Sequence, residues 1–170
     1  TITGGNYGWR VNQIGEAAAI KKLILEGKAS ERTPEFSKTA ASKTEPDYGN
    51  TYIEVNLTSQ HLYYYKNGQK VFESDFVSGN EASGKSTPAG VYQVMYKREN
   101  AVLSNEGENN NAKYWLPFNG NIGFNDAPWR SGFGGETYKN EGSQGNINLP
   151  PDAAKSLFES VENGTPVLCF

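Results

Sequence analysis

The feature that most constrains the fold is a series of short strand-like segments that begins at Thr51. Apolar and aromatic residues alternate with polar ones over Tyr52–Leu57 and Gln60–Tyr65, and the Asn67-Gly68 pair that follows is a strong hairpin signal. Further segments of this kind lie at 71–78, 90–96 and 165–170. Each alternating segment has one apolar face to bury, so the sequence predicts a mainly β domain, a sandwich of two packed sheets or a barrel-like variant.

One helix is expected within this domain, over about Ala153–Val161. Pro150-Pro151 precedes it, as is typical of a helix start, and Leu157 and Phe158 fall on the face that would pack against the sheets. Asn163-Gly164 ends it. The asparagine-rich stretch 105–111 is expected to be an exposed loop.

The chain before Thr51 has a different texture, and we divide the sequence at 1–28, 29–49 and 50–170. Residues 11–27 show a roughly helical apolar pattern that Gly27 stops, and residues 7–11 are consistent with a short strand. Residues 29–49 are rich in Ser, Thr, Glu, Pro and Lys, which is typical of a linker. We expect the helix to lie outside the β domain.

Composition excludes several classes of function. The net charge is -3, with lysines and arginines scattered, so the basic surface of a nucleic-acid binder is missing. The single cysteine, Cys169, excludes a disulfide framework and fits a cytosolic or a surface protein. No apolar run approaches the roughly 20 residues of a membrane span, and no signal peptide precedes Thr1. Because the chain begins with Thr and not Met, it is consistent with a fragment whose export signal or membrane anchor lies upstream of Thr1.

Two segments near the end of the chain carry a resemblance to a known family. Residues 122–135 are IGFNDAPWRSGFGG, and residues 142–151 are GSQGNINLPP. They resemble the L,D-transpeptidase (YkuD-type) catalytic domain, especially its Gram-positive forms, in which a histidine precedes an Asp-X-X-Trp-like stretch and a Ser-His-Gly-Cys-hydrophobic-Asn signature follows. The hairpin at 52–65, the Ser-Thr-Pro-Ala-Gly run at 86–90 and the closing 164–167 match in the same order. The resemblance covers 50–170, and residues 7–27 more weakly resemble the end of the preceding peptidoglycan-associated domain.

The resemblance implies a specific chemistry. In this family a cysteine thiolate attacks a carbonyl of a peptidoglycan tetrapeptide stem, expels the terminal D-alanine and passes the acyl group to an amine of a neighbouring stem, forming a 3-3 cross-link. The histidine before the Asp-X-X-Trp-like stretch generates the thiolate, and a serine backbone carbonyl orients that imidazole. Backbone amides near the cysteine bind the oxyanion. No cofactor and no metal are involved.

Three of the positions that should carry this chemistry hold amides in this sequence. The base histidine falls on Asn125, the signature histidine on Gln144 and the nucleophile on Asn146, while Ser143 keeps the orienting serine. An amide nitrogen is a poor nucleophile, and neither Asn125 nor Gln144 takes up a proton near neutral pH. The resemblance further implies a set of retained substrate-binding positions, namely Gly145, Asn148, Trp129, Arg130 and Gly135.

No other residue offers a substitute for the lost groups. The only histidine, His61, lies in an alternating strand far upstream, where a plain strand role is the better interpretation. Cys169 ends an apolar strand, whereas a reactive cysteine needs an electropositive, partly exposed environment. The retained glycines and Trp129 also have a structural interpretation, as tight turns and a core residue.

Three hypotheses for the function follow. The favoured one is a pseudoenzyme that binds peptidoglycan stem peptides or a cell-wall partner protein at the outer, wall-facing side of a bacterium. The second is a working L,D-transpeptidase, either because the chain is an engineered inactive variant of an active parent or because the chemistry follows a route that the sequence does not reveal. The third is a structural spacer, which requires a filled cleft at Asn146. For the first, we predict that Asn125, Ser143, Gln144 and Asn146 converge in one cleft, with the Asn125 and Asn146 side chains directly hydrogen-bonded or bridged by water.

Overall fold

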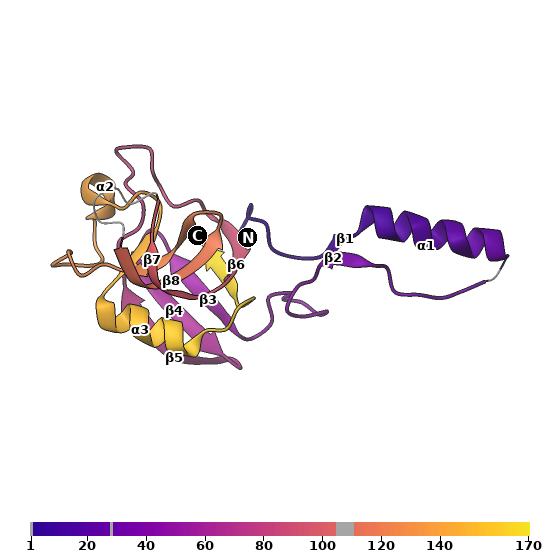
Figure 1. Ribbon diagram of the computed structural model, residues 1–170. Helices are drawn as coiled ribbons and strands as arrows, with labels where there is room; N and C mark the ends of the chain where they lie inside the picture. The colour runs from indigo at the N-terminus through magenta and orange to yellow at the C-terminus, as the bar shows by residue number, and fades with distance from the viewer. Residues whose placement is uncertain (1, 28, 105–110) are drawn as a thin grey trace. The chain divides into compact units, whose positions relative to one another are not determined.

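The computed structural model describes residues 2–27, 29–104 and 111–170 and is mainly β, as predicted (Figure 1). The chain forms two compact units. The larger joins the chain up to Tyr7 with Gly49–Phe170, and the smaller is Gly8–Tyr48. This division differs from the boundaries expected at 28 and 49, which stay a prediction. No helix within the described ranges has both the length and the apolar character that crossing a membrane requires.

The first sheet of the larger unit has five strands. Its order is β5 (Gln69–Asp75), β4 (His61–Lys66), β3 (Tyr52–Asn56), β11 (Pro166–Cys169) and β6 (Gly90–Gln93). β3, β4 and β5 form the predicted antiparallel meander, and Asn67 and Gly68 make the tight turn with φ angles of 53° and 79°. The strand expected over 71–78 ends at Asp75, because Val77 leaves this sheet and exchanges two backbone hydrogen bonds with Asn148.

The second sheet has four strands, in the order β10 (Ile147–Leu149), β9 (Ile122–Asp126), β8 (Asn111–Asn119) and β7 (Arg98–Val102). β7, β8 and β9 pair antiparallel, whereas β10 pairs parallel to β9. A four-residue helix, α2 (Tyr138–Glu141), lies in the connection between β9 and β10. The exposed loop expected over 105–111 falls mostly on residues 105–110, outside the described residues, and Asn111 begins β8.

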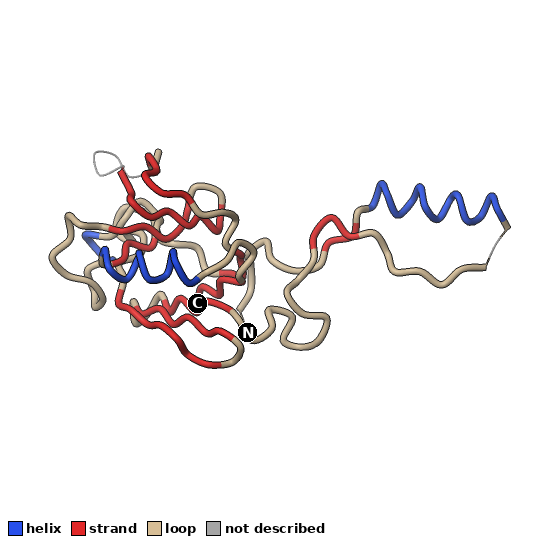
Figure 2. The backbone as a smooth tube through the Cα atoms, turned by 60° about the horizontal axis from the view of Figure 1, so that its bottom comes forward, coloured by secondary structure: helices blue, strands red, loops and turns tan. Residues whose placement is uncertain are grey.

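The two sheets and one helix enclose the main apolar core, and a smaller apolar cluster lies at β7 and β8. Side chains from both sheets meet there, among them Ile53, Leu62, Leu116 and Phe124, all fully buried. Figure 2 shows the helix α3 (Pro151–Ser160) lying alongside the strands. It begins two residues before the expected start, with Pro151 in its first turn, and it buries Ala154 and Leu157. The predicted packing of this helix against the sheets is confirmed.

The smaller unit contains β1 (Arg10–Val11), α1 (Gln13–Glu26) and β2 (Phe36–Lys38), with β1 and β2 paired antiparallel. The predicted helix is present. The Asn12 side chain accepts the Gly15 N–H at its start, and Gly27 ends it in the left-handed region. α1 buries none of its own residues. β2 lies inside the stretch that the composition assigned to a linker.

Candidate functional site

The parallel pair of strands β9 and β10 positions most of the predicted site residues. In this pair Asn148 lies opposite Asn125, and Ile147 lies opposite Phe124. Because side chains alternate along a strand, Phe124 and Ile147 enter the main apolar core while Asn125 and Asn148 face the other way. Asn125 is also the cross-strand partner of Trp115 on β8. Both asparagine side chains are fully buried.

Asn146, at the position of the family nucleophile, is part of the fold's hydrogen bonding. Its side chain is fully buried, and its Oδ1 accepts the backbone N–H of Gly123 on β9 at 3.2 Å. In a β-sheet the Gly123 N–H would normally donate to the backbone of a neighbouring strand. Here the Asn146 side chain accepts it instead, just before β10 begins. An amide oxygen held in this way serves as a structural acceptor.

The turn that leads into Asn146 is closed by two hydroxyl groups. Ser143 Oγ donates to the Asn146 carbonyl at 2.6 Å and accepts the Gly145 N–H at 3.0 Å. Thr87 Oγ1 donates to the Gly145 carbonyl at 2.7 Å and accepts the Gly79 N–H at 3.0 Å. Gly145 has a φ of 117°, which favours glycine. Gln144, by contrast, is exposed on this otherwise buried turn.

A chain of hydrogen bonds links Asn125 to Arg130 through Asn148. Asn148 Nδ2 donates to Asn125 Oδ1 at 3.0 Å, and Asn148 Oδ1 accepts from Arg130 Nε at 2.8 Å. Asn125 Nδ2 donates to the Asp126 carbonyl at 2.9 Å. Among the described residues every buried side-chain nitrogen or oxygen has a hydrogen-bond partner. The polar site is therefore a satisfied network of amides, hydroxyls and one guanidinium.

The structure brings Asn125, Ser143 and Asn146 into one neighbourhood, through Gly123, Asn148 and the 143–146 turn. The direct or water-bridged contact expected between the Asn125 and Asn146 side chains stays a prediction. In the family mechanism the groups at these positions would transfer a proton and attack a carbonyl. Amides at the same places can donate and accept hydrogen bonds, and they can do neither of those reactions.

The chain's cysteine and histidine belong to the other sheet. Cys169 is fully buried in the apolar core on β11, and burial raises the pKa of its thiol far above the ordinary value. His61 is on β4, where its ring nitrogens lie 2.6 Å from Asp75 Oδ1 and 3.4 Å from Glu73 Oε2. Both residues belong to the five-stranded sheet, whereas the 143–146 turn leads into β10 of the four-stranded sheet. This agrees with the expectation that Cys169 is a core residue and His61 a strand residue.

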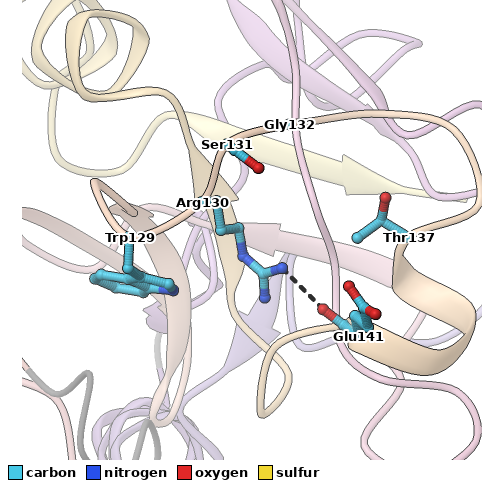
Figure 3. Close-up of a pocket in the computed structure, with 6 residues that line it drawn as sticks. All are labelled: Trp129, Arg130, Ser131, Gly132, Thr137 and Glu141. Atoms are coloured by element: carbon cyan, nitrogen blue, oxygen red, sulfur yellow. Dashed lines mark hydrogen bonds between the residues drawn. The ribbon is translucent and has the colours of Figure 1, made fainter.

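An open pocket of about 380 Å³ lies in the connection between β9 and β10. It is lined by Trp129, Arg130, Ser131, Gly132, Thr137 and Glu141. In Figure 3 the guanidinium of Arg130 lies between the indole of Trp129 and the backbone oxygen of Glu141, which accepts from Arg130 Nη1 at 2.8 Å. Two residues that the resemblance implied for substrate binding, Trp129 and Arg130, therefore line one pocket, whereas Gly135, an exposed glycine with a φ of 62°, does not line it.

Several residues of the site were not predicted. Thr87 lies in the Ser-Thr-Pro-Ala-Gly run that was noted only as a family feature, and its two hydrogen bonds give that run a physical role. Ser131 and Thr137 lie in the connection between β9 and β10, and no sequence motif marked them as site residues. Glu141 holds Arg130 through its backbone oxygen, which no side-chain pattern can reveal.

Comparisons with known proteins agree with this description. A family model described as the L,D-transpeptidase catalytic domain (YkuD) matches residues 50–169. A crystal structure of an Enterococcus faecium L,D-transpeptidase carrying a cysteine-to-serine substitution is 39% identical, with a TM-score of 0.82 over 100% of this chain and 69% of that one. The catalytic domain of the E. faecium enzyme, solved by NMR, is 40% identical, with a TM-score of 0.63 over 76% of this chain and 100% of that one.

More distant structures share the fold. An L,D-transpeptidase from Mycobacterium smegmatis is 18% identical, with a TM-score of 0.61 over 84% of this chain and 64% of that one. No significant match was found among curated proteins. The family model covers most of the chain, and the similarity to the E. faecium enzyme extends over the whole length of this chain. The chain therefore belongs to the L,D-transpeptidase family, with residues 50–169 forming its YkuD domain.

Proposed function

We propose that this protein is a catalytically inactive member of the L,D-transpeptidase family that binds peptidoglycan stem peptides. The observation that carries the proposal is the state of Asn146. The residue at the nucleophile position is an amide, is fully buried, and accepts the Gly123 N–H in the β-sheet hydrogen bonding. A group so placed contributes to the fold, and it is a poor nucleophile because its nitrogen lone pair is delocalised into the carbonyl.

Loss of the base supports the same conclusion. Asn125 engages both ends of its amide, with Asn148 donating to its oxygen and its own nitrogen donating to Asp126 O. Removing one member of a nucleophile and base pair commonly lowers the rate by several powers of ten, and losses of groups that act together do not simply add. We therefore expect no measurable acyl transfer from the site.

Peptide binding is proposed because an open pocket lies beside the amide network. The pocket at Trp129 and Arg130 is open, and it presents a cation, hydroxyl groups and an aromatic ring close to the amide network. Because the chain belongs to this family, we propose a peptidoglycan stem as the ligand of the pocket and a location on the wall-facing side of a bacterium. A cell-wall protein that docks at the same pocket is the alternative partner. The spacer hypothesis requires a filled cleft at Asn146, which is fully buried and does not line this pocket, so that hypothesis stays open.

The test of inactivity uses two compounds that acylate a relative. One E. faecium neighbour is described as acylated by ertapenem, and another similar structure is an avibactam carbamoyl enzyme. Intact-mass spectrometry after incubation with each compound should show an unmodified protein. A mass increase equal to either compound would mean that a nucleophile is present, and the proposal would be wrong.

The test of binding uses isotope-labelled protein and soluble muropeptides. We expect NMR shift changes at the Trp129 indole N–H and at the Asn148 side-chain amide, which is linked to the pocket through Arg130. If neither signal moves at millimolar muropeptide, stem-peptide binding fails and the wall-protein partner becomes the hypothesis to test.

The similarity to the E. faecium enzyme favours one second candidate, an active L,D-transpeptidase whose site is altered in this chain. The two candidates differ in the codons at positions 125, 144 and 146 of the source genome. Histidine, histidine and cysteine codons would establish the active enzyme, and asparagine, glutamine and asparagine codons would establish a natural pseudoenzyme.

A further inference from the structure

A short segment near the beginning of the chain, residues 4–7, lies along the edge of β6, and we call it the strap (Figure 1). The Val91 N–H donates to the Gly4 oxygen at 3.1 Å, and the Val91 oxygen accepts the N–H groups of Asn6 and Tyr7, both at 3.0 Å. The other edge of β6 pairs with β11, so the strap covers the edge at which the five-stranded sheet would otherwise end.

The strap approaches β6 so closely that only glycine fits at the contact. A Cβ atom on Gly5 would overlap the Val91 backbone oxygen, and a Cβ atom on Gly90 would lie 2.6 Å from the Gly5 nitrogen. Both glycines also have positive φ angles, 92° and 148°, which other residues rarely adopt. One added methyl group at Gly5 should therefore separate the strap from β6.

The main chain that the strap holds leads directly to the candidate site. β6 follows the Ser-Thr-Pro-Ala-Gly run, in which the buried Thr87 lies shortly before Val91. Thr87 Oγ1 donates to the Gly145 oxygen at 2.7 Å and accepts the Gly79 N–H at 3.0 Å. The strap thus fixes the chain that follows Thr87, and Thr87 fixes the 143–146 turn.

Other contacts keep β6 in place when the strap is absent. The Tyr92 hydroxyl lies 3.3 Å from the Pro88 oxygen and 3.1 Å from the Ala89 oxygen, and β6 keeps its pairing with β11. Release of the strap should therefore loosen the run before β6 without unfolding the sheet. This partial support is what a conformational device requires, because the rest of the domain remains folded in both states.

We propose that the strap is a detachable positioning element for the candidate site, and that its release from β6 loosens the 143–146 turn through Thr87. The chain passes from Tyr7 directly into the smaller unit at Gly8. A partner that binds the smaller unit and draws Tyr7 away from β6 would change the site without contacting it. The link is reciprocal, so a ligand that orders the 143–146 turn would also tighten the strap. The device does not depend on which ligand the site takes.

The experiment measures amide hydrogen exchange by NMR in the unsubstituted protein and in three glycine-to-alanine variants. Gly5→Ala should speed exchange of the strap amides by about tenfold or more, and of the Gly79 and Gly145 amides by about fivefold, the effect of losing roughly one hydrogen bond. Gly4→Ala, whose Cβ would lie 3.3 Å from the backbone of the same run, should act in the same direction and less strongly. The matched control is Gly27→Ala. Gly27 also has a positive φ, 63°, but a Cβ there meets no atom of the described residues within 4 Å, so no site amide should change.

A fourth variant tests the route through the threonine hydroxyl. Thr87→Val keeps the shape of the side chain and removes both of its hydrogen bonds. In the Thr87→Val background, Gly5→Ala should have little further effect on Gly145 exchange. An effect as large as in the unsubstituted protein would show that the coupling does not pass through Thr87, and the assigned route would be wrong.

The outcomes separate a positioning role from a simple cover of the sheet edge. If the strap amides of Gly5→Ala exchange faster while Gly79 and Gly145 keep their rates, the strap only covers β6 and the proposal is wrong. If the strap amides keep their protection, the glycine contact does not hold the strap, and the proposal is overturned as well. The Leu62 amide on β4 serves as the reference, because an equal change there would indicate general destabilisation and contradict the proposal. Should Gly5→Ala fail to fold, as judged by its melting curve, the milder Gly4→Ala decides by the same criteria.

Discussion

Asn148 links the amide network to the pocket, and its replacement by alanine gives a quantitative test of that network. The Asn148 side chain donates to Asn125 Oδ1 and accepts from Arg130 Nε. Asn148→Ala removes both bonds at once and leaves a buried acceptor on Asn125 without its donor. The backbone hydrogen bonds between Asn148 and Val77 do not involve the side chain and should persist.

The expected loss follows from the burial of the two partners. An unsatisfied buried acceptor costs about 1–3 kcal/mol. Arg130 is half-buried, so water can replace most of the lost bond to Nε, and we add no more than about 1 kcal/mol for it. The sum is about 1–4 kcal/mol of unfolding free energy. At roughly 4 °C per kcal/mol for a domain of this size, the melting temperature should fall by about 4–16 °C.

A double-mutant cycle with Asn125→Ala isolates the bond between the two side chains. Because either single change breaks that bond, the double variant should lose less than the sum of the two single losses, by about 0.5 kcal/mol or more. The measurement is urea unfolding followed by tryptophan fluorescence. Strict additivity, or a loss for Asn148→Ala below about 1 kcal/mol, would show that the amides do not form a coupled network.

Three further predictions concern the lost chemistry, the buried Cys169 and the half-buried Glu54. Asn146→Cys alone should give a thiol whose pKa lies above the ordinary ~8.5, because the position is buried, and it should form little adduct with ertapenem. The triple variant Asn125→His, Gln144→His and Asn146→Cys should form an adduct seen by intact-mass spectrometry, because the groups act as a unit. Burial raises the pKa of Cys169, so the folded state disfavours its thiolate. The free energy of unfolding should therefore decline as pH rises above about 8.5, and Cys169→Ala should reduce this decline in urea unfolding measured from about pH 7 to 10. Burial also raises the pKa of Glu54 on β3, so its contribution to stability is full below about pH 4.3 and is lost as pH rises through the raised value. Glu54→Gln should therefore remove that loss, and a variant whose stability fell with pH as before would contradict this.

The elements that could be predicted from the sequence are those specified by local pattern. The meander of β3, β4 and β5 follows from alternation and from the Asn67-Gly68 turn, and α3 follows from its proline start and its apolar face. The second sheet gave a weaker signal. β7 is largely polar, and β10 has only three residues, so its parallel pairing with β9 depends on contacts between distant parts of the chain.

The boundary between the two units and the contacts of the site residues could not be predicted from the sequence, because they depend largely on main-chain groups. Residues just before the smaller unit join the larger one because Asn6 and Tyr7 both donate backbone N–H groups to Val91 O, and such bonds leave no trace in side-chain pattern. At the site, motif resemblance identified the positions of Asn125, Ser143 and Asn146. It could not show that their side chains are bound to Gly123, Asn148 and the 143–146 turn.

The exchange of catalytic groups for amides has a physical consequence for the family fold. A catalytic thiol and imidazole must stay partly unsatisfied to meet a substrate, and a buried polar group without a partner costs stability. Asn146 and Asn125 occupy those positions, and each has a hydrogen-bond partner. Asn146 accepts from Gly123, and Asn125 accepts from Asn148. The same substitutions that remove the chemistry therefore relieve the fold of that cost. Restoring cysteine and histidine at these positions should therefore lower the melting temperature even where it restores acylation, and a triple variant as stable as the unsubstituted protein would refute this reasoning.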